Sequence, residues 1–252
     1  MADFDESVQK SKRVLLMLSG GRDSFLSACH LIEEGYYVQM ITYDNGCMSD
    51  TDAVQKVAER IIKKCGSEHA SYVGVRGISV GVFRLQKAFL YSTIDQINKL
   101  YPKLRPAQLP CLACHTSMYL ESIAYCKAHN IHYMAEGARE SQKFFVELPD
   151  MVERYKELSA KNGIELILPV YKLQDDWERK LELADRGYVP KTQEPQCWIG
   201  CPLGKELDSD EIRSLAKYYD EEMKPQLQGL IDGKVKIYRF KEEDDREEYV
   251  EF

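Results

Sequence analysis

The 252-residue chain lacks any apolar run near the roughly 18 residues that a helix needs to span a bilayer. Residues 1–13, MADFDESVQKSKR, are polar and acidic and contain no apolar segment of the kind found in signal peptides. We therefore expect a cytoplasmic protein without a membrane partner. The chain also lacks an excess of positive charge, because its formal net charge is −7. This balance argues against a strongly basic nucleic-acid binder.

Two common phosphate-binding patterns are missing from the glycine-containing loop near residue 20. The loop has neither the G-x-x-x-x-G-K-[ST] spacing of a Walker loop nor the G-x-G-x-x-G spacing of a dinucleotide fingerprint. Signs of export are missing too, so the eight cysteines are not expected to form a disulfide framework. Metal ligation or catalysis is the better expectation for cysteines that are paired by their spacing.

Apolar β-branched runs alternate along the chain with amphipathic segments of helical length. We expect strands at 13–18, 36–43, 69–75, 131–137 and 164–170. We expect helices near 23–35, 50–66 (with Asp50 as N-cap), 79–98, 114–129, 149–161 and 174–186. This alternation predicts an α/β fold with a parallel sheet covered on both faces. Ligands of such sheets bind at the carboxyl ends of the strands.

The stretch Ser19-Gly20-Gly21-Arg22-Asp23-Ser24 links the first expected strand to the first expected helix. Glycines allow positive φ and a close approach of the backbone, and the amide groups at a helix N-terminus favour anions. Ser19 and Ser24 add hydroxyl donors, and Asp23 is expected to cap the helix or help hold Mg²⁺. The alternative is a plain strand-to-helix turn without a ligand.

This Ser-Gly-Gly-x-Asp-Ser motif resembles the PP-loop of the N-type ATP pyrophosphatases. The resemblance implies a Rossmann-like (HUP-type) domain, which we place at residues 1–202, with a C-terminal appendage and acidic tail at 203–252. It implies that ATP is split into AMP and pyrophosphate, with Asp23 and Ser24 as catalytic residues. Further along, Tyr43 ends the second strand, where the family's backbone holds adenine. Gly137 and Arg139 stand in a region similar to the family's later nucleotide-binding motif.

Two tight cysteine pairs follow the loop at a distance. Cys111 and Cys114 form one C-x-x-C pair, and Cys197 and Cys201 are separated by three residues. Together these four thiols fit a zinc site or part of an iron–sulfur site. The alternative is that the four cysteines are unrelated.

The first pair, placed before an expected helix and a glycine-containing strand, resembles the tRNA thiolases of the same superfamily. The resemblance implies that Cys111 and Cys114 act as catalytic thiols or as ligands of a [4Fe–4S] cluster, with Cys197 or Cys201 as the third ligand. Zn²⁺ remains the alternative metal. Cys47 is a further candidate for a catalytic thiol. His115, beside Cys114, is a candidate for a residue that assists the chemistry.

These features predict an ATP- and Mg²⁺-dependent sulfur transferase that acts on a tRNA base or a small carbonyl compound, with a sulfur donor as a further partner. One alternative is a ligase like 7-cyano-7-deazaguanine synthase, which uses ammonia; another is a non-catalytic nucleotide-binding regulator. The sequence is also compatible with a homo-oligomer. Trp177 and Trp198 are expected to pack in the interior. Residues expected to contact RNA are Arg84, Lys87, Lys99, Lys103 and Arg105, interleaved with Tyr91 and Tyr101.

Overall fold

The computed structural model describes residues 12–187, 197–198 and 206–233. Its centre is a five-stranded parallel sheet in the order β3-β2-β1-β4-β5. The strands are β1 (Lys12–Met17), β2 (Tyr36–Asp44), β3 (Ala70–Gly77), β4 (Tyr133–Glu136) and β5 (Glu165–Ile167). The expected α/β class and parallel sheet are confirmed.

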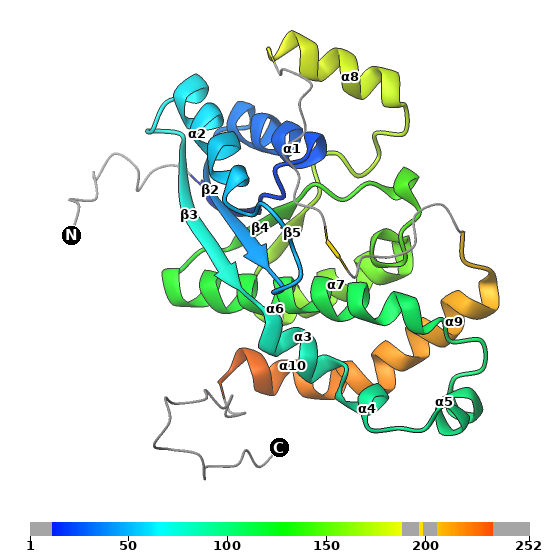
Figure 1. The fold of residues 1–252 in the computed structure, drawn as a ribbon. Helices are drawn as coiled ribbons and strands as arrows, with labels where there is room; N and C mark the ends of the chain where they lie inside the picture. The colour runs from blue at the N-terminus through cyan, green and yellow to red at the C-terminus, as the bar shows by residue number, and fades with distance from the viewer. Residues whose placement is uncertain (1–11, 188–196, 199–205, 234–252) are drawn as a thin grey trace.

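Helices lie on both faces of the sheet (Figure 1). They are α1 (Arg22–Glu33), α2 (Ala53–Cys65), α3 (Ser79–Leu85), α4 (Lys87–Leu90), α5 (Ile94–Leu100), α6 (Leu109–His129), α7 (Pro149–Lys161), α8 (Asp176–Asp185), α9 (Ser209–Tyr218) and α10 (Lys224–Ile231). In the part of the chain that the structure describes, no helix is both long enough and apolar enough to cross a membrane.

The central strand β1 contributes to two separate hydrophobic cores. Leu15 and Met17 belong to a cluster with residues of α6, α7, α9 and α10, whereas Val14 and Leu16 belong to a cluster with residues of α1 and α2. Successive side chains of a strand point to opposite faces, so an uninterrupted apolar run supplies both cores. This explains why β1 has no polar alternation.

The chain order places a switch point beside β1. From β1 the chain passes through α1 to β2 on one side, and it later passes through α6 to β4 on the other side. The loops at the carboxyl ends of β1 and β4 therefore leave in different directions and open a crevice between them. This crevice is where a ligand site is expected in such a sheet.

Three of the expected helix boundaries are wrong. The expected helix 79–98 is divided into α3, α4 and α5, because Thr93 and Gln96 form a capping box that starts a new helix. The expected helix 114–129 begins earlier, at Leu109, so Cys111 and Cys114 lie on α6 rather than before it. Asp50 has a φ of +57° and is not the N-cap of α2, which is Asp52.

The segment after residue 205 begins with α9, whose Asp208 and Glu211 form a capping box. α9 continues through a π-helical turn, Tyr219–Met223, into α10. Apolar side chains of all three elements belong to the same cluster as Leu15 and α6. The domain boundary at residue 202 stays a prediction, and the expected acidic tail lies largely outside the described residues.

Gly137, the residue after β4, lies against the first turn of α1. A Cβ atom at this position would be 2.6 Å from the backbone nitrogen of Ser24 and 2.8 Å from the carbonyl carbon of Asp23. No side chain fits at such distances from rigid backbone, so only glycine lets the end of β4 approach α1 this closely.

We therefore expect Gly137→Ala to lower the free energy of unfolding by about 1–3 kcal/mol, as overpacking does. Urea unfolding followed by circular dichroism measures the change. Gly77→Ala is the matched control, because a Cβ there meets nothing within 4 Å, and it should change stability by less than about 0.5 kcal/mol. Equal effects of the two substitutions would contradict the close contact at Gly137.

Candidate active site

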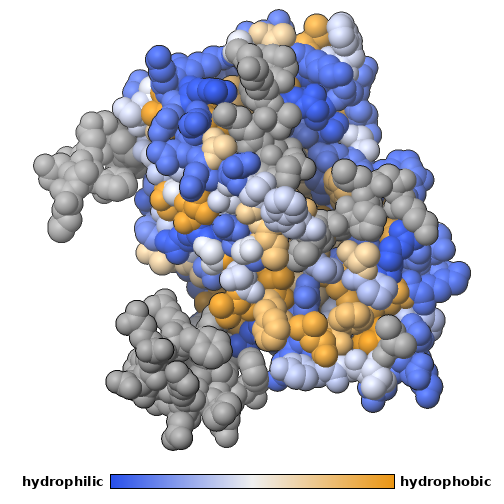
Figure 2. Space-filling model, in the orientation of Figure 1, coloured by the Kyte–Doolittle hydropathy of each residue, from blue (hydrophilic) through white to orange (hydrophobic). Residues whose placement is uncertain are grey.

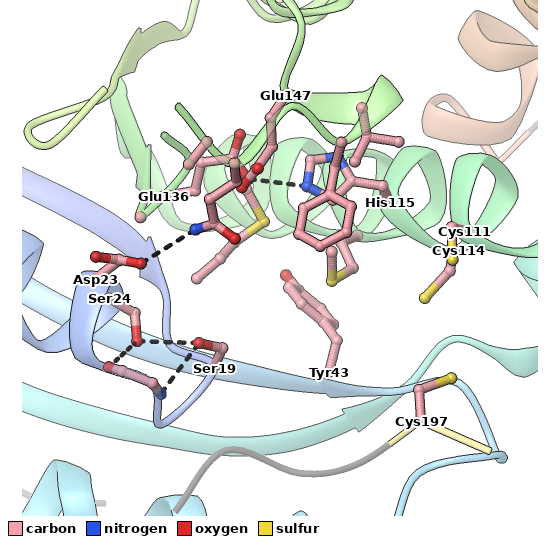
Figure 3. Close-up of a pocket in the computed structure, with 18 of the residues that line it drawn as sticks. Ser19, Asp23, Ser24, Tyr43, Cys111, Cys114, His115, Glu136, Glu147 and Cys197 are labelled. Carbon is pink, nitrogen blue, oxygen red and sulfur yellow. Dashed lines mark hydrogen bonds and ion pairs between the residues drawn. The ribbon is translucent and has the colours of Figure 1, made fainter. Parts of the chain in front are cut away.

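A cavity of about 600 Å³ opens at the switch point of the sheet. Its walls come from the β1–α1 loop, the end of β2, the first turns of α6 and the segment after β4. Figure 3 shows the Ser19–Ser24 loop at one end and the cysteines at the other, with Tyr43 and His115 between them. The expected site residues that line it are Ser19, Gly21, Asp23, Ser24, Tyr43, Cys111, Cys114, Gly137, Arg139 and Cys197. Cys201 lies outside the described residues.

The loop after β1 is held by its own hydroxyl groups. Gly20 has a φ of +81°, which turns the chain sharply before the helix. The Gly21 backbone N–H donates to Ser19 Oγ at 3.2 Å, and the Ser24 hydroxyl donates to the Gly21 carbonyl at 3.1 Å. Ser19 Oγ and Ser24 Oγ lie 3.2 Å apart. The loop therefore places two hydroxyls beside the N-terminus of α1, where the helix dipole favours an anion.

Asp23 is held by two arginines. Arg179 Nη1 donates to its Oδ1 at 2.8 Å and to its Oδ2 at 3.0 Å, and Gln142 Nε2 donates to Oδ2 at 3.1 Å. Arg139 Nε lies 3.1 Å from Oδ2, although its N–H does not point at that oxygen. Asp23 does not cap α1, whose N-cap is Gly21 with no side-chain bond.

The two arginines still carry unused donors. The Nε atoms of Arg139 and Arg179 are buried and have no hydrogen-bond acceptor among the described residues. Both side chains line the cavity beside the loop. Buried guanidinium N–H groups without acceptors suit a phosphate, so these arginines complement the anion site of the loop. Sequence reasoning missed Arg179, which is far from the loop in sequence and has no motif around it.

Three thiols lie at the opposite end of the cavity. Cys111 and Cys114 are three residues apart on α6 and thus share one face of the helix. Asn45 Nδ2 lies 3.4 Å from Cys114 Sγ and 3.6 Å from Cys197 Sγ and donates to both. The amide of Asn45 therefore connects the α6 pair to a cysteine far along the chain.

Cys197 is fixed by short backbone contacts. Met48 and Cys197 form an isolated antiparallel bridge, and the Trp198 N–H donates to the Cys47 carbonyl at 2.8 Å. Burial raises the pKa of the Cys114 thiol to about 11, while the Asn45 donor acts in the opposite direction. Nearby Cys111, Cys197 and Cys47 raise that pKa further. Cys47 therefore belongs to the same group of thiols.

Among the described residues, no three Cys, His, Asp or Glu side chains stand close enough to hold one metal ion. The donor set itself, with three thiols on one cavity, consists of the soft ligands that zinc and iron–sulfur clusters prefer. The ligands of a cluster bind separate iron atoms and need not surround one ion. The thiols are soft donors that suit either group, and the choice between a [4Fe–4S] cluster and Zn²⁺ stays a prediction.

A buried polar cluster that includes two carboxyl groups lines the wall between the two ends. Glu136, the last residue of β4, accepts a hydrogen bond from the Tyr119 hydroxyl on one oxygen. Its other oxygen lies 3.2 Å from His115 Nε2. Tyr119 stacks on Tyr155 with ring centroids 4.1 Å apart, which fixes the tyrosine. Glu136 is thus a carboxylate with partners on both oxygens.

Glu147 is the second carboxyl group of this wall. Its Oε2 atom is buried without a hydrogen-bond partner among the described residues. Burial raises the pKa of Glu147 from 4.5 to about 8, and the negative charge of Glu136 adds to the shift. Sequence reasoning missed both glutamates, because no spacing or motif distinguishes them from the other acidic residues.

The residues expected to contact RNA are largely engaged with acidic partners. Lys103 pairs with Asp210 at 3.0 Å, and Arg105 pairs with Glu211 at the start of α9. Arg84 is buried. The basic stretch is thus neutralised at several positions, and α3–α5 instead present exposed apolar side chains (Figure 2). These are Val80, Phe83, Leu90, Tyr91 and Leu100.

Both tryptophans are exposed, so the expectation that they pack in the interior is wrong. Trp177 is 66% exposed in the first turn of α8, and Trp198 is 80% exposed beside Cys197. Trp177 lies on the exposed face of the expected amphipathic helix, next to the buried Arg179 face.

Residues 12–166 match the family model of the tRNA methyl transferase HUP domain. No curated protein sequence gives a match. Among solved structures, a 4-thiouridine synthetase in complex with RNA and ATP has a TM-score of 0.57 and 13% identity. The alignment covers 88% of this chain and 53% of that one, so this chain spans about half its length. At such identity the likeness shows the fold alone.

Two further solved structures align with most of this chain. NMN synthetase from Francisella tularensis is 13% identical, with a TM-score of 0.49 and 93% of this chain and 91% of that chain covered. The U34-tRNA thiolase NcsA from Methanococcus maripaludis, with its [4Fe–4S] cluster, is 14% identical, with a TM-score of 0.47 and coverages of 91% and 72%.

The raised pKa of Glu147 predicts a pH-dependent stability. Its folded pKa of about 8 exceeds the ordinary value of 4.5, so the wild type should lose stability as pH rises between these values. The loss is about 1.4 kcal/mol for each pH unit. Glu147→Gln should remove this slope and become the more stable protein near pH 8. Thermal and urea unfolding at pH 5 and 8 measure the change in the free energy of unfolding, and Glu153→Gln, at an exposed position, is the control. If Glu147→Gln kept the wild-type dependence on pH, the raised pKa of Glu147 would be contradicted.

Proposed function

Since the chain belongs to the tRNA methyl transferase HUP domain family, within the PP-loop ATP pyrophosphatase superfamily, we propose that it adenylates a carbonyl oxygen and then replaces that oxygen with sulfur. The observation that carries this proposal is one cavity with an anion-binding loop at one end and three thiols at the other. An enzyme that joins adenylation to thiol chemistry needs both ends within reach of one substrate.

The loop end is suited to the triphosphate of ATP. Backbone N–H groups at the start of α1 and the hydroxyls of Ser19 and Ser24 bind the phosphates that leave as pyrophosphate. Arg139 and Arg179 supply guanidinium Nε donors that have no hydrogen-bond acceptor among the residues that the structure describes. Asp23 orients the arginines and, with the phosphates, provides oxygen ligands for Mg²⁺. The proposed contact for the adenine is the backbone at Tyr43, near the end of β2, while the Tyr43 hydroxyl is engaged with Ser122 Oγ at 2.7 Å.

The thiol end supports delivery of sulfur. The acceptor's carbonyl oxygen bonds to the α-phosphorus of ATP and pyrophosphate leaves. A sulfur nucleophile from a donor then attacks the activated carbon, and AMP leaves with the former carbonyl oxygen. Cys111, Cys114 and Cys197 would hold the group that presents this sulfur. When bound there through three thiolates, a [4Fe–4S] cluster supplies an iron with an open position for a sulfur ligand.

The acceptor in this proposal is a tRNA base or a small carbonyl compound. Wrapping a tRNA requires many Lys or Arg contacts with phosphates, but Lys103 and Arg105 are paired with acidic residues. A tRNA acceptor therefore calls for added positive surface from a partner or a second copy, for which the exposed apolar face of α3–α5 is the suited contact. The thiols at the cavity favour sulfur transfer over the ammonia-using ligase.

The first test is the product pattern of ATP cleavage. With unfractionated tRNA as acceptor, the protein should release AMP and pyrophosphate, and Ser24→Ala should lower turnover on the order of 10²-fold, as for loss of a donor to a developing charge. Chromatography of radiolabelled ATP identifies the products. Ser209→Ala, on an exposed position of α9, should behave as the wild type. Release of ADP and phosphate instead would overturn the proposal.

The second test concerns the thiols. Protein purified without oxygen should bind iron and sulfide and absorb broadly near 400 nm, a general property of such clusters, and Cys114→Ser should lose this band while still binding ATP. Absorption spectra, metal analysis and equilibrium dialysis with ATP measure these properties. Cys65→Ser, on α2, is the matched control. Stoichiometric zinc without colour would instead support the zinc alternative, and loss of the band in the control alone would exclude the assigned thiols.

A further inference from the structure

The carboxyl pair Glu136 and Glu147 has no part in binding the phosphates or presenting the sulfur, yet both side chains line the cavity between those two ends. Figure 3 shows them above Tyr43, between Asp23 and the cysteines. Two acidic side chains this close in a buried wall cost free energy unless they bind a proton or a ligand. Their position therefore indicates a role in the reaction.

The partners of the two carboxyl groups differ. Glu136 accepts from the Tyr119 hydroxyl on one oxygen and faces His115 Nε2 with the other, so both of its oxygens have partners. Glu147 Oε2 has no partner among the described residues and is shielded from solvent. A proton shared by the pair is therefore held best by Glu147, whose side chain lines the cavity where a ligand binds.

We propose that Glu147 is the base that removes the proton from an N–H group beside the carbonyl oxygen that becomes adenylated. The proposal rests on the proposed function and deepens it, because it limits the acceptor to a lactam or amide with a free N–H next to the reacting carbonyl. Glu136 is a positioning residue, whose charge makes Glu147 a stronger base.

In the adenylation step, the N–H bond of the acceptor breaks and its proton moves to the Glu147 carboxylate. The electron pair of that bond becomes the second C–N bond, and the C=O π pair becomes the bond from oxygen to the α-phosphorus of ATP. The bond from this phosphorus to the pyrophosphate oxygen breaks, so the products are an O-adenylated imidate, pyrophosphate and protonated Glu147.

The pH dependence of this step follows from the surroundings of Glu147. The titratable and charged groups that face it are Glu136 from β4, Asp23 from α1, Arg139, Tyr119 from α6 and Tyr171. Burial and Glu136 together raise the pKa of Glu147 to about 8. Below this pH the base is protonated, so the adenylation rate should rise with pH and level off near pH 8.

The first experiment follows AMP release in single turnovers of the full chain with ATP and unfractionated tRNA between pH 6 and 9. The wild-type rate should rise with pH up to about pH 8. Glu147→Gln should lower the rate on the order of 10²-fold and remove this rise, with the KM for ATP unchanged, since the amide keeps the shape but cannot take the proton. Glu153→Gln, on the exposed face of α7, is the control. A Glu147→Gln variant with the wild-type rate and pH profile overturns the proposal.

The second experiment needs no turnover and separates this proposal from the proposed function. Saturation-transfer NMR compares the binding of uridine with that of 3-methyluridine, which has no N–H left on its base, in the presence of a non-hydrolysable ATP analogue. The wild type should prefer uridine about tenfold, and Glu147→Ala should lose that preference while keeping its circular dichroism spectrum. If no AMP forms but the preference is present and depends on Glu147, the adenylation reaction fails and the N–H recognition stands. If AMP forms and neither Glu147 variant changes rate or preference, only the role of Glu147 fails.

Discussion

The contact between the backbone of Gly137 and the first turn of α1 is the constraint on which the rest of the site depends. A Cβ at Gly137 would be 2.6 Å from the Ser24 nitrogen, so β4 and α1 meet with backbone against backbone. Because the strand ends so close to the loop, Glu136 before this glycine and Arg139 after it both face the cavity. The phosphate end and the acidic wall are therefore positioned by one glycine.

The cavity changes in chemistry along its length. Near the loop, Arg139 and Arg179 pair with Asp23 and Asp176, and their Nε atoms have no hydrogen-bond acceptor among the described residues. In the middle lie the carboxyl groups of Glu136 and Glu147, and the far end is made of thiols and the amide of Asn45. In the proposed function, a ligand that fills the cavity presents negative charge at the loop, then an N–H donor, then a carbon open to a sulfur nucleophile.

Much of the fold could be predicted from the sequence because the apolar runs of a buried parallel sheet are long and the turns between them contain glycine. The divided helix at 79–98 was missed because its apolar spacing continues across the break, although the Thr93–Gln96 capping box marks the new start. The early start of α6 was missed because proline is typical of loops, whereas Pro110 lies in the first turn of α6, where a helix tolerates it.

The site could be predicted where a motif carried the chemistry, as in the Ser19–Ser24 loop and the cysteine pairs. Arg179 and Glu147 could not be predicted, since what distinguishes them is burial and the neighbours that folding brings to them.

The fold also gives the chain two intrinsic fluorescent probes. Its only tryptophans are both exposed, with Trp177 two residues before the arginine that holds Asp23 and Trp198 directly after the third thiol. Intrinsic fluorescence thus reports separately on the two ends of the cavity, and single Trp→Phe replacements assign each signal without adding a label.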